Sequence, residues 1–249
     1  MLLRCAAEVV RAGEGADLVF VGRSLENLYD LLCGALDETS WRGRAQLLQL
    51  SLRGVRSPGQ LRREAPGALE QLWCYFRELR LTPPQLLLRE RPVAFVDLVC
   101  SGRTLGALLR LLHAWCGGRP GRWRQVRERV RFVAVVEVGH PRWTPWRAEH
   151  SEWPGSLAPD HVRRVWLQSE HWRFLGEDQD KTTESFTYRR WSDPRARAAP
   201  PDGERHAAAR LGRALFRRGA WERAALGRRI ARSPCPPELE PLARELCSA

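Results

Sequence analysis

Residues 93–104 have the sequence VAFVDLVCSGRT, and this stretch decides the fold that we expect. Residues 93–96 are four consecutive apolar residues, a run that is typical of a strand buried on both faces of a sheet. Asp97 ends this run, a turn follows at residues 100–103, and residues 105–115 (LGALLRLLHAW) have apolar side chains at helical spacing. The stretch therefore predicts a strand, a turn and a helix in succession.

The same succession occurs earlier in the chain. Residues 17–21 (DLVFV) are a short apolar run, residues 22–24 form a predicted turn, and residues 25–36 have the spacing of an amphipathic helix. Residues 46–52 and 131–138 are further candidate strands. Apolar strands followed directly by amphipathic helices indicate an α/β fold with a mostly parallel, doubly wound sheet, which is the fold class we predict.

The second half of the chain has a different composition, with many tryptophans and then a Pro- and Ala-rich stretch. Within it, residues 161–168 are a candidate edge strand and residues 174–191 a polar capping loop. We predict four regions: an α/β core at residues 1–140, a Trp-rich hood at 141–192, a linker at 193–203 and a helical C-terminal segment at 204–249.

The chain is strongly basic, with a net charge of +12, and its basic residues are 40 arginines and one lysine, Lys181. So uneven a choice is typical of GC-rich coding, and the arginines are spread along the chain instead of forming one cluster. We interpret them as a solvated basic surface. Nucleic-acid binding is the alternative that such a charge leaves open.

Several classes of site and location are disfavoured by the sequence. Seven cysteines without a CxxC pair and six dispersed histidines argue against a disulfide framework and against a metal site. No apolar run is long enough to span a membrane, and Arg4, Glu8 and Arg11 interrupt the apolar start of the chain. We therefore expect a cytoplasmic protein without a membrane span, and we expect it to form a homo-oligomer.

The end of the strand that precedes Asp97 has the features of a phosphate site. In open α/β sheets, ligands bind at the carboxyl ends of the strands. Small residues let backbone N–H groups converge on phosphate oxygens, and the start of a helix adds positive potential. We predict that Asp97 accepts hydrogen bonds from sugar hydroxyls and that Ser101, Gly102, Arg103 and Thr104 bind the phosphate. The alternative for Asp97 is a turn carboxylate that accepts backbone N–H groups.

The segment contains neither GxxxxGK[ST] nor GxGxxG. It resembles the ribose-phosphate loop of type I phosphoribosyltransferases, in which an apolar strand leads to two acidic residues, two apolar residues and a small-residue turn ending in Gly-x-Thr. Asp97 matches the second acidic residue, Leu98 and Val99 match the apolar pair, and residues 100–104 (CSGRT) match the phosphate-binding turn. Val96 stands where the family has its first acidic residue.

The resemblance covers about residues 15–140 and implies a ligand and a reaction. The ligand would be phosphoribosyl diphosphate or a related ribose phosphate, with Mg²⁺ bound through the diphosphate, and the reaction would be phosphoribosyl transfer to an unidentified acceptor. Asp97 would be the catalytic residue that holds the ribose, and Arg23 and Ser24 would bind the diphosphate. Asp97 and Arg23 should then lie at the same end of adjacent parallel strands. For Ser24 the alternative is helix capping.

Two alternatives to an enzyme of this family remain. Because the family uses its acidic pair to hold the ribose hydroxyls, Val96 favours a non-catalytic ligand-sensing or regulatory protein of the same fold, with nucleic acid as a further contact. A phosphatase-like or kinase-like α/β enzyme is a third interpretation, for which the chain contains no motif.

The predicted hood supplies candidate contacts to the acceptor, which the family often covers with aromatic side chains. We name Trp166, Trp172 and Phe174; the alternative is that they only pack the hood on the sheet. Lys181 lies in a polar loop and is a candidate contact to phosphate or acceptor, with no role as the alternative. Cys100 is interpreted as lining the phosphate-binding turn, and the alternative of a nucleophile is disfavoured because no histidine neighbours it.

Overall fold

The structure of the protein is a computed structural model that describes residues 1–52, 54–55, 57–139, 161–192 and 203–248. The predicted linker, apart from its last residue, and the first part of the predicted hood lie outside the described residues. Within the described ranges, none of the helices has the length and apolar composition needed to cross a bilayer.

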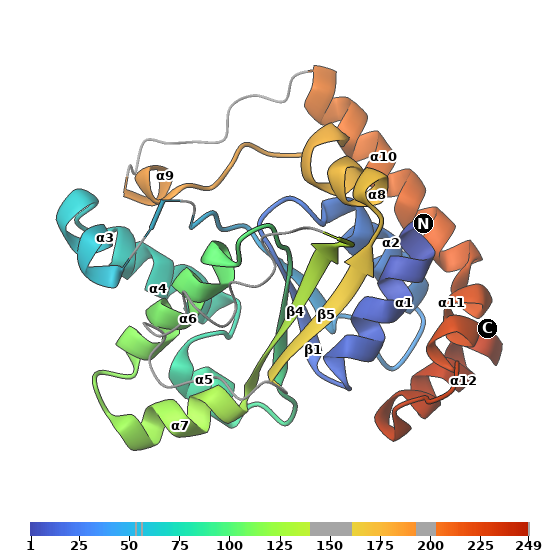
Figure 1. The fold of residues 1–249 in the computed structure, drawn as a ribbon, viewed down its shortest axis with the longest axis horizontal. Helices are drawn as coiled ribbons and strands as arrows, with labels where there is room; N and C mark the ends of the chain where they lie inside the picture. The colour runs from blue at the N-terminus through green and yellow to red at the C-terminus, as the bar shows by residue number, and fades with distance from the viewer. Residues whose placement is uncertain (53, 56, 140–160, 193–202, 249) are drawn as a thin grey trace.

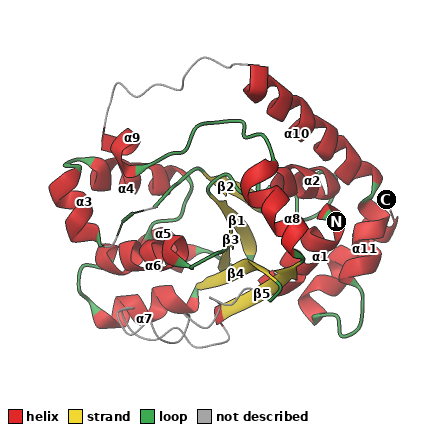
Figure 2. Ribbon diagram, turned by 45° about the horizontal axis from the view of Figure 1, so that its top comes forward, coloured by secondary structure: helices red, strands yellow, loops and turns green. Residues whose placement is uncertain are grey.

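Five strands form one parallel sheet in the order β2-β1-β3-β4-β5 (Figure 2). From β1 the chain steps to β2 on one side and then returns to β3 on the other, so the direction of winding changes between β1 and β3. The sheet is therefore the parallel α/β sheet that the sequence predicts. The strands are β1 (Asp17–Val21), β2 (Ala45–Leu48), β3 (Val93–Leu98), β4 (Val130–Glu137) and β5 (Val162–Leu167).

Helices cover both faces of the sheet (Figures 1 and 2). One face is covered by α3 (Pro58–Glu64), α4 (Ala68–Glu78), α5 (Pro83–Leu88), α6 (Arg103–Trp115) and α7 (Pro120–Glu128). The other face is covered by α1 (Leu2–Gly13) and α2 (Glu26–Leu36). Outside these two helices lie α10 (Gly203–Trp221), α11 (Arg223–Ile230) and α12 (Glu240–Ser248), the last preceded by the short turn η5 (Pro237–Leu239).

The central strand β3 shows why its sequence is continuously apolar. Val93 and Phe95 lie in the core beneath α4 and α6, whereas Ala94 and Val96 lie in the core beneath α1 and α2. All four side chains are fully buried. Because both faces of a parallel sheet are covered, alternate residues have no polar side to face, and an unbroken apolar run results.

The C-terminal helices belong to the same body as the sheet. Helix α10 packs along α2, and the contact is so close that a Cβ atom at Gly219 would lie 1.9 Å from the carbonyl oxygen of Leu31. Only a residue without a side chain allows this approach of the two backbones. The described part of residues 204–249 is largely helical, and its helices form a layer outside α1 and α2.

The sheet continues into the region that the sequence assigned to the hood. The candidate edge strand at residues 161–168 is confirmed as β5, which pairs with β4 along its whole length. The core sheet therefore does not end at residue 140. After β5 come α8 (Ser169–Arg173), the π-helical turn η4 (Phe174–Asp178) and α9 (Tyr188–Ser192), so the predicted capping loop is partly helical.

Candidate functional site

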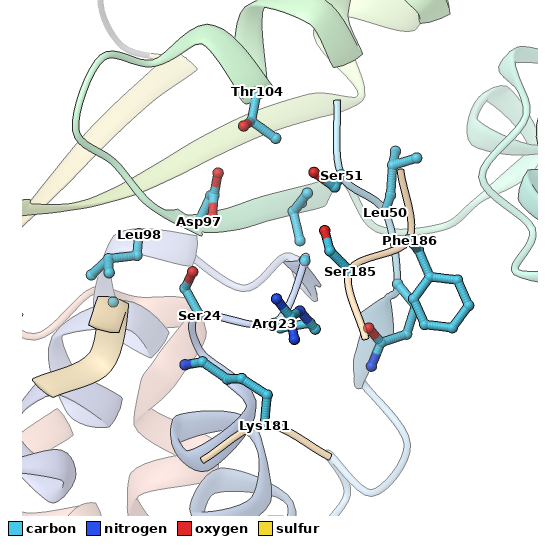
Figure 3. Close-up of a pocket in the computed structure, with 14 residues that line it drawn as sticks. Arg23, Ser24, Leu50, Ser51, Asp97, Leu98, Thr104, Lys181, Ser185 and Phe186 are labelled. Atoms are coloured by element: carbon cyan, nitrogen blue, oxygen red, sulfur yellow. The ribbon is translucent and has the colours of Figure 1, made fainter. Parts of the chain in front are cut away.

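A pocket of about 190 Å³ lies at the carboxyl ends of β1, β2 and β3 (Figure 3). It includes the point between β1 and β3 where the winding changes direction, which is where open α/β sheets bind ligands. Its volume is below the ~300–1,000 Å³ typical of pockets that enclose a whole small molecule. It therefore suits the charged part of a ligand. The lining residues are Val21, Gly22, Arg23, Ser24, Gln49, Leu50, Ser51, Asp97, Leu98, Thr104, Gly176, Lys181, Ser185 and Phe186.

The turn after β1 brings a guanidinium into the pocket. Gly22 has a φ of 74°, a left-handed conformation that glycine adopts without strain, and the chain turns there toward α2. Arg23 follows, and its Nη1 donates to the carbonyl oxygen of Thr183 at 2.5 Å. Helix α2 has Leu25 at its N-cap and no side-chain cap, so the alternative of helix capping by Ser24 is wrong. Arg23 and Ser24 both line the pocket, as the sequence predicts.

Asp97 enters the pocket from the neighbouring strand and is buried, with 8% of its surface exposed. It forms no ion pair with a basic side chain within the described ranges. Burial raises the pKa of Asp97 to about 8, although the backbone N–H of Leu98 opposes the shift by donating to the carboxylate. The side chain is therefore a neutral carboxylic acid at neutral pH, able both to donate and to accept a hydrogen bond.

The predicted arrangement of Arg23 and Asp97 is confirmed. Strands β1 and β3 are parallel neighbours, with Phe20 opposite Val96, so the residues that follow these positions leave the sheet at the same edge. Both side chains line the one pocket (Figure 3). Val96 itself lies in the opposite core beneath α1 and α2, one residue before Asp97 and on the other side of the sheet.

The predicted phosphate-binding turn contributes less to the pocket than the sequence suggests. Thr104, in the first turn of α6, lines it. Gly102 is buried at the N-cap of α6, Ser101 is half-buried, and Cys100 and Arg103 are exposed; none of these four lines the pocket. The positive start of a 13-residue helix nevertheless faces the pocket through Thr104.

One wall of the pocket is residues 176–187, which we call the strap. It leads from η4 to α9 across the carboxyl end of the sheet (Figure 1). Its strongest attachment is to Glu26, which is buried in the first turn of α2 and accepts from Thr182 N at 3.0 Å and Thr182 Oγ1 at 2.9 Å. Two further hydrogen bonds run from Gln179 Nε2 to Ser24 O at 2.5 Å and from Ser51 N to Phe186 O at 2.9 Å.

The strap carries Lys181 into the pocket beside Arg23 (Figure 3). Lys181 Nζ donates to the carbonyl oxygen of Leu175 at 2.9 Å. Burial lowers the pKa of Lys181 to about 8; Glu26 opposes this shift, and Arg23 adds to it. In the part of the chain that the structure describes, neither Lys181 nor Arg23 forms an ion pair. Two cations share a pocket, and an anion would neutralise both.

The aromatic residues predicted to contact an acceptor lie elsewhere. Trp172 and Phe174 pack against the core beneath α1 and α2, and Trp166 on β5 is 50% exposed. None of the three lines the pocket, whereas Phe186 of the strap does. The packing alternative thus describes Trp172 and Phe174. Phe186 could not be singled out from the sequence, because nothing in its polar segment indicates which residues turn toward the sheet.

The end of β2 supplies lining residues that the sequence reasoning missed. Gln49 and Ser51 follow this strand, and Ser185 faces them from the strap. The side-chain oxygen of Gln49 is buried and has no hydrogen-bond partner among the described residues, so it is an acceptor that a ligand's donor could use. The signal was available, because residues after every parallel strand reach the same edge of the sheet.

The pocket fits Mg²⁺ only together with a phosphorylated ligand. Groups of three or more Asp, Glu, His or Cys side chains suited to a metal ion do not occur among the residues that the structure describes. Asp97 contributes the one carboxyl group to the described lining. Mg²⁺ is commonly held by one or two carboxylates plus phosphate oxygens and water. Asp97 would be the protein's ligand, and the phosphates would provide the rest.

The fold and the pocket together define an α/β protein with a parallel sheet and a polar pocket at its winding switch point. Comparisons of the chain with family models, with curated proteins and with solved structures found no match. Its function is therefore inferred from the chemistry of the pocket.

Proposed function

We propose that the chain binds a ribose 5-phosphate compound, either phosphoribosyl diphosphate or a related ribose phosphate, in the pocket between β1 and β3. The observation that carries this proposal is the juxtaposition of two cations, Arg23 and Lys181, with the acid Asp97 and the first turn of α6; within the described residues neither cation forms an ion pair. Such a pocket suits a ligand with two separated anionic groups and hydroxyls between them.

The ligand's parts match the walls of the pocket. A 5-phosphate would bind at Thr104 and the N–H groups of the first turn of α6. The ribose hydroxyls would exchange hydrogen bonds with Asp97, and a diphosphate at C1 would contact Arg23 and Ser24. Lys181 would supply a second positive charge at the diphosphate end. The small volume of the pocket leaves the remainder of a larger ligand at its rim.

Binding without transfer is the second candidate, and the position of Val96 favours it. A transferase stabilises positive charge at the anomeric carbon, which requires ionised groups around the ribose. Here Val96 is buried in the opposite core, and Asp97 is protonated at neutral pH. The pocket thus offers hydrogen bonds to the ribose and no carboxylate charge until a cation or a higher pH ionises Asp97.

Calorimetric titration tests the proposal. Wild-type protein should bind phosphoribosyl diphosphate in the presence of Mg²⁺, and Arg23→Gln should weaken binding about tenfold or more, because a charge-assisted hydrogen bond is lost. Arg103→Gln is the matched control, since Arg103 is exposed and lies outside the pocket. Absence of binding to every phosphorylated ribose overturns the proposal. Binding without diphosphate release, across a panel of acceptor bases, selects the non-catalytic candidate.

A further inference from the structure

The amine of Lys181 is available for chemistry other than charge pairing. It faces the pocket, donates one hydrogen bond to a carbonyl oxygen, and has no carboxylate within ion-pair distance in the described part of the chain. Its pKa is lowered to about 8 by burial. A neutral amine is a nucleophile whereas an ammonium is not, and desolvation is the usual means by which proteins activate a lysine.

Asp97 provides a proton donor in the same pocket. Its carboxyl group is buried, lines the same pocket as Lys181 and forms no ion pair within the described residues. A neutral carboxylic acid can protonate a carbonyl oxygen and, afterwards, a departing hydroxyl group. The two groups come from opposite walls, and the Ser24 hydroxyl lies between them in the view of Figure 3. The other charged side chain among the lining residues is Arg23.

We infer that Lys181 forms an imine with the open-chain aldehyde of an aldose 5-phosphate, with ribose 5-phosphate as the simplest example. This inference rests on the proposed function and narrows it, because phosphoribosyl diphosphate is substituted at C1 and has no free aldehyde. With the 5-phosphate at Thr104, C1 of the ligand would point toward Arg23 and Ser24. Lys181 lies at that same wall (Figure 3).

The step balances with groups that the pocket contains. Nζ of neutral Lys181 attacks the aldehyde carbon while the Asp97 carboxyl group gives its proton to the aldehyde oxygen. The proton lost from Nζ returns to the Asp97 carboxylate and is then given to the carbinolamine hydroxyl, which leaves as water. The products are a protonated imine, one water molecule and an ionised Asp97. The positive imine and the negative Asp97 carboxylate then attract each other, which offsets the burial penalty that either charge would have without the other.

Reductive trapping tests the inference directly. Ribose 5-phosphate and the full chain are incubated near pH 8, where Lys181 titrates, and borohydride then reduces any imine to a stable secondary amine. Peptide mass spectrometry locates the adduct. Because Lys181 is the only lysine, the other amine that can react is the N-terminus, which serves as an internal standard for unspecific modification.

Three matched controls sharpen the experiment. Ribose without phosphate carries the same aldehyde. We expect its trapping at Lys181 to be reduced by about tenfold or more, because the charge-assisted contacts to phosphate are missing. Lys181→Arg keeps the positive charge and should lose the adduct at this position. Asp97→Asn should slow trapping by about 100-fold, the usual contribution of a general acid.

The outcomes separate this inference from the proposed function. A phosphate-dependent adduct at Lys181 supports it. Calorimetric binding of ribose 5-phosphate without an adduct, or an adduct at the N-terminus alone, overturns the imine and leaves the binding function standing. Absence of both binding and adduct overturns both.

Discussion

The two ends of the β-sheet differ in whether their ionisable side chains form ion pairs in the described residues. At the amino end, Asp17 lies between two guanidiniums, with Arg44 Nε at 3.0 Å and Arg89 Nη1 at 2.6 Å. At the carboxyl end, Asp97 and Lys181 line one pocket, and neither forms an ion pair in the described part of the chain. Both ends draw on the same pair of neighbouring strands, β1 and β3.

A second acidic residue repeats the pattern of the amino end. Glu14, just before β1, is 2.6 Å from Arg163 Nη2 and 3.4 Å from Arg131 Nη1, and these arginines lie at the starts of β5 and β4. Paired charges of this kind link the strands and leave little for a ligand to bind. Burial without an ion-pair partner disfavours the charged forms of Asp97 and Lys181, and a ligand of opposite charge can offset this penalty. The pocket at the carboxyl end therefore differs from the amino end in that its ionisable side chains have no ion-pair partners among the described residues.

The largest expected effect comes from breaking the amino end. Asp17→Ala leaves Arg44 and Arg89 mostly buried without their partner, and we expect a loss of about 3 kcal/mol of unfolding free energy. Urea denaturation measures this. The matched control is Asp37→Ala, whose pair with Arg42 is exposed and should change stability by less than about 0.5 kcal/mol. Equal effects of the two substitutions would show that the mostly buried ion pairs of Asp17 stabilise the fold no more than an exposed pair does.

The carboxyl end should respond with the opposite sign. The folded-state pKa of Asp97 is raised to about 8, so its contribution to stability is fully present below the unfolded pKa and is lost as pH rises through 8. Asp97→Asn removes this loss. We expect the variant to be more stable than wild type by a few kcal/mol at about pH 8 and equal to it at about pH 4. Urea denaturation across this range measures the difference; a constant difference at all pH values contradicts it.

Ligand binding should itself shift that titration. In the proposed binding mode, saturating phosphoribosyl diphosphate with Mg²⁺ would place a cation near Asp97, which would favour the ionised carboxylate and lower its pKa. The pH dependence of stability between about pH 4 and pH 8 should therefore flatten in the presence of the ligand. Thermal denaturation with and without ligand at several pH values measures this, and Asp97→Asn should show no such flattening.

The smallest effect concerns Lys181. Its lowered pKa means that holding the ammonium in the pocket disfavours folding below about pH 8, and that this penalty fades as pH rises toward the ordinary value of 10.5. Because the side chain is only partly buried, solvent screening limits the penalty, and Lys181→Met should stabilise the protein by less than about 1 kcal/mol at neutral pH. A destabilised variant would mean that the bond to Leu175 outweighs the burial of charge.

The sequence was sufficient for the strands and for the edge of the sheet where the pocket lies. Residues 17–21 and 93–96 are short apolar runs followed by turns, a pattern that is typical of buried parallel strands. Arg23 and Asp97 could be predicted because Asp97 ends one of these apolar runs and Arg23 comes two residues after the other. Local pattern and tertiary placement agree there, since the end of a strand fixes where the next residues go.

In the strap and the hood, the direction of the side chains could not be predicted from the sequence. Phe186 and Ser185 lie in a polar segment without period, which is held at the pocket by hydrogen bonds to Ser51, beyond the end of β2, and to Glu26 of α2. Trp172 and Phe174 were chosen for their chemistry, yet their helical backbone directs them into the core. Sequence gives the type of a side chain, but its direction in a segment without regular period depends on contacts that are distant along the chain.

The strap also determines when the pocket can form during synthesis of the chain. Arg23 Nη1 and the carbonyl oxygen of Thr183 are joined across 160 sequence positions. The ribosome releases the first strands many seconds before the strap at ~5–20 residues per second. Until the strap is made, Arg23 and Glu26 lack their hydrogen-bond partners Thr183 and Thr182. The wall that the strap contributes to the pocket is therefore made after β1, β2 and β3, and a nascent chain that ends before residue 176 has these strands without that wall.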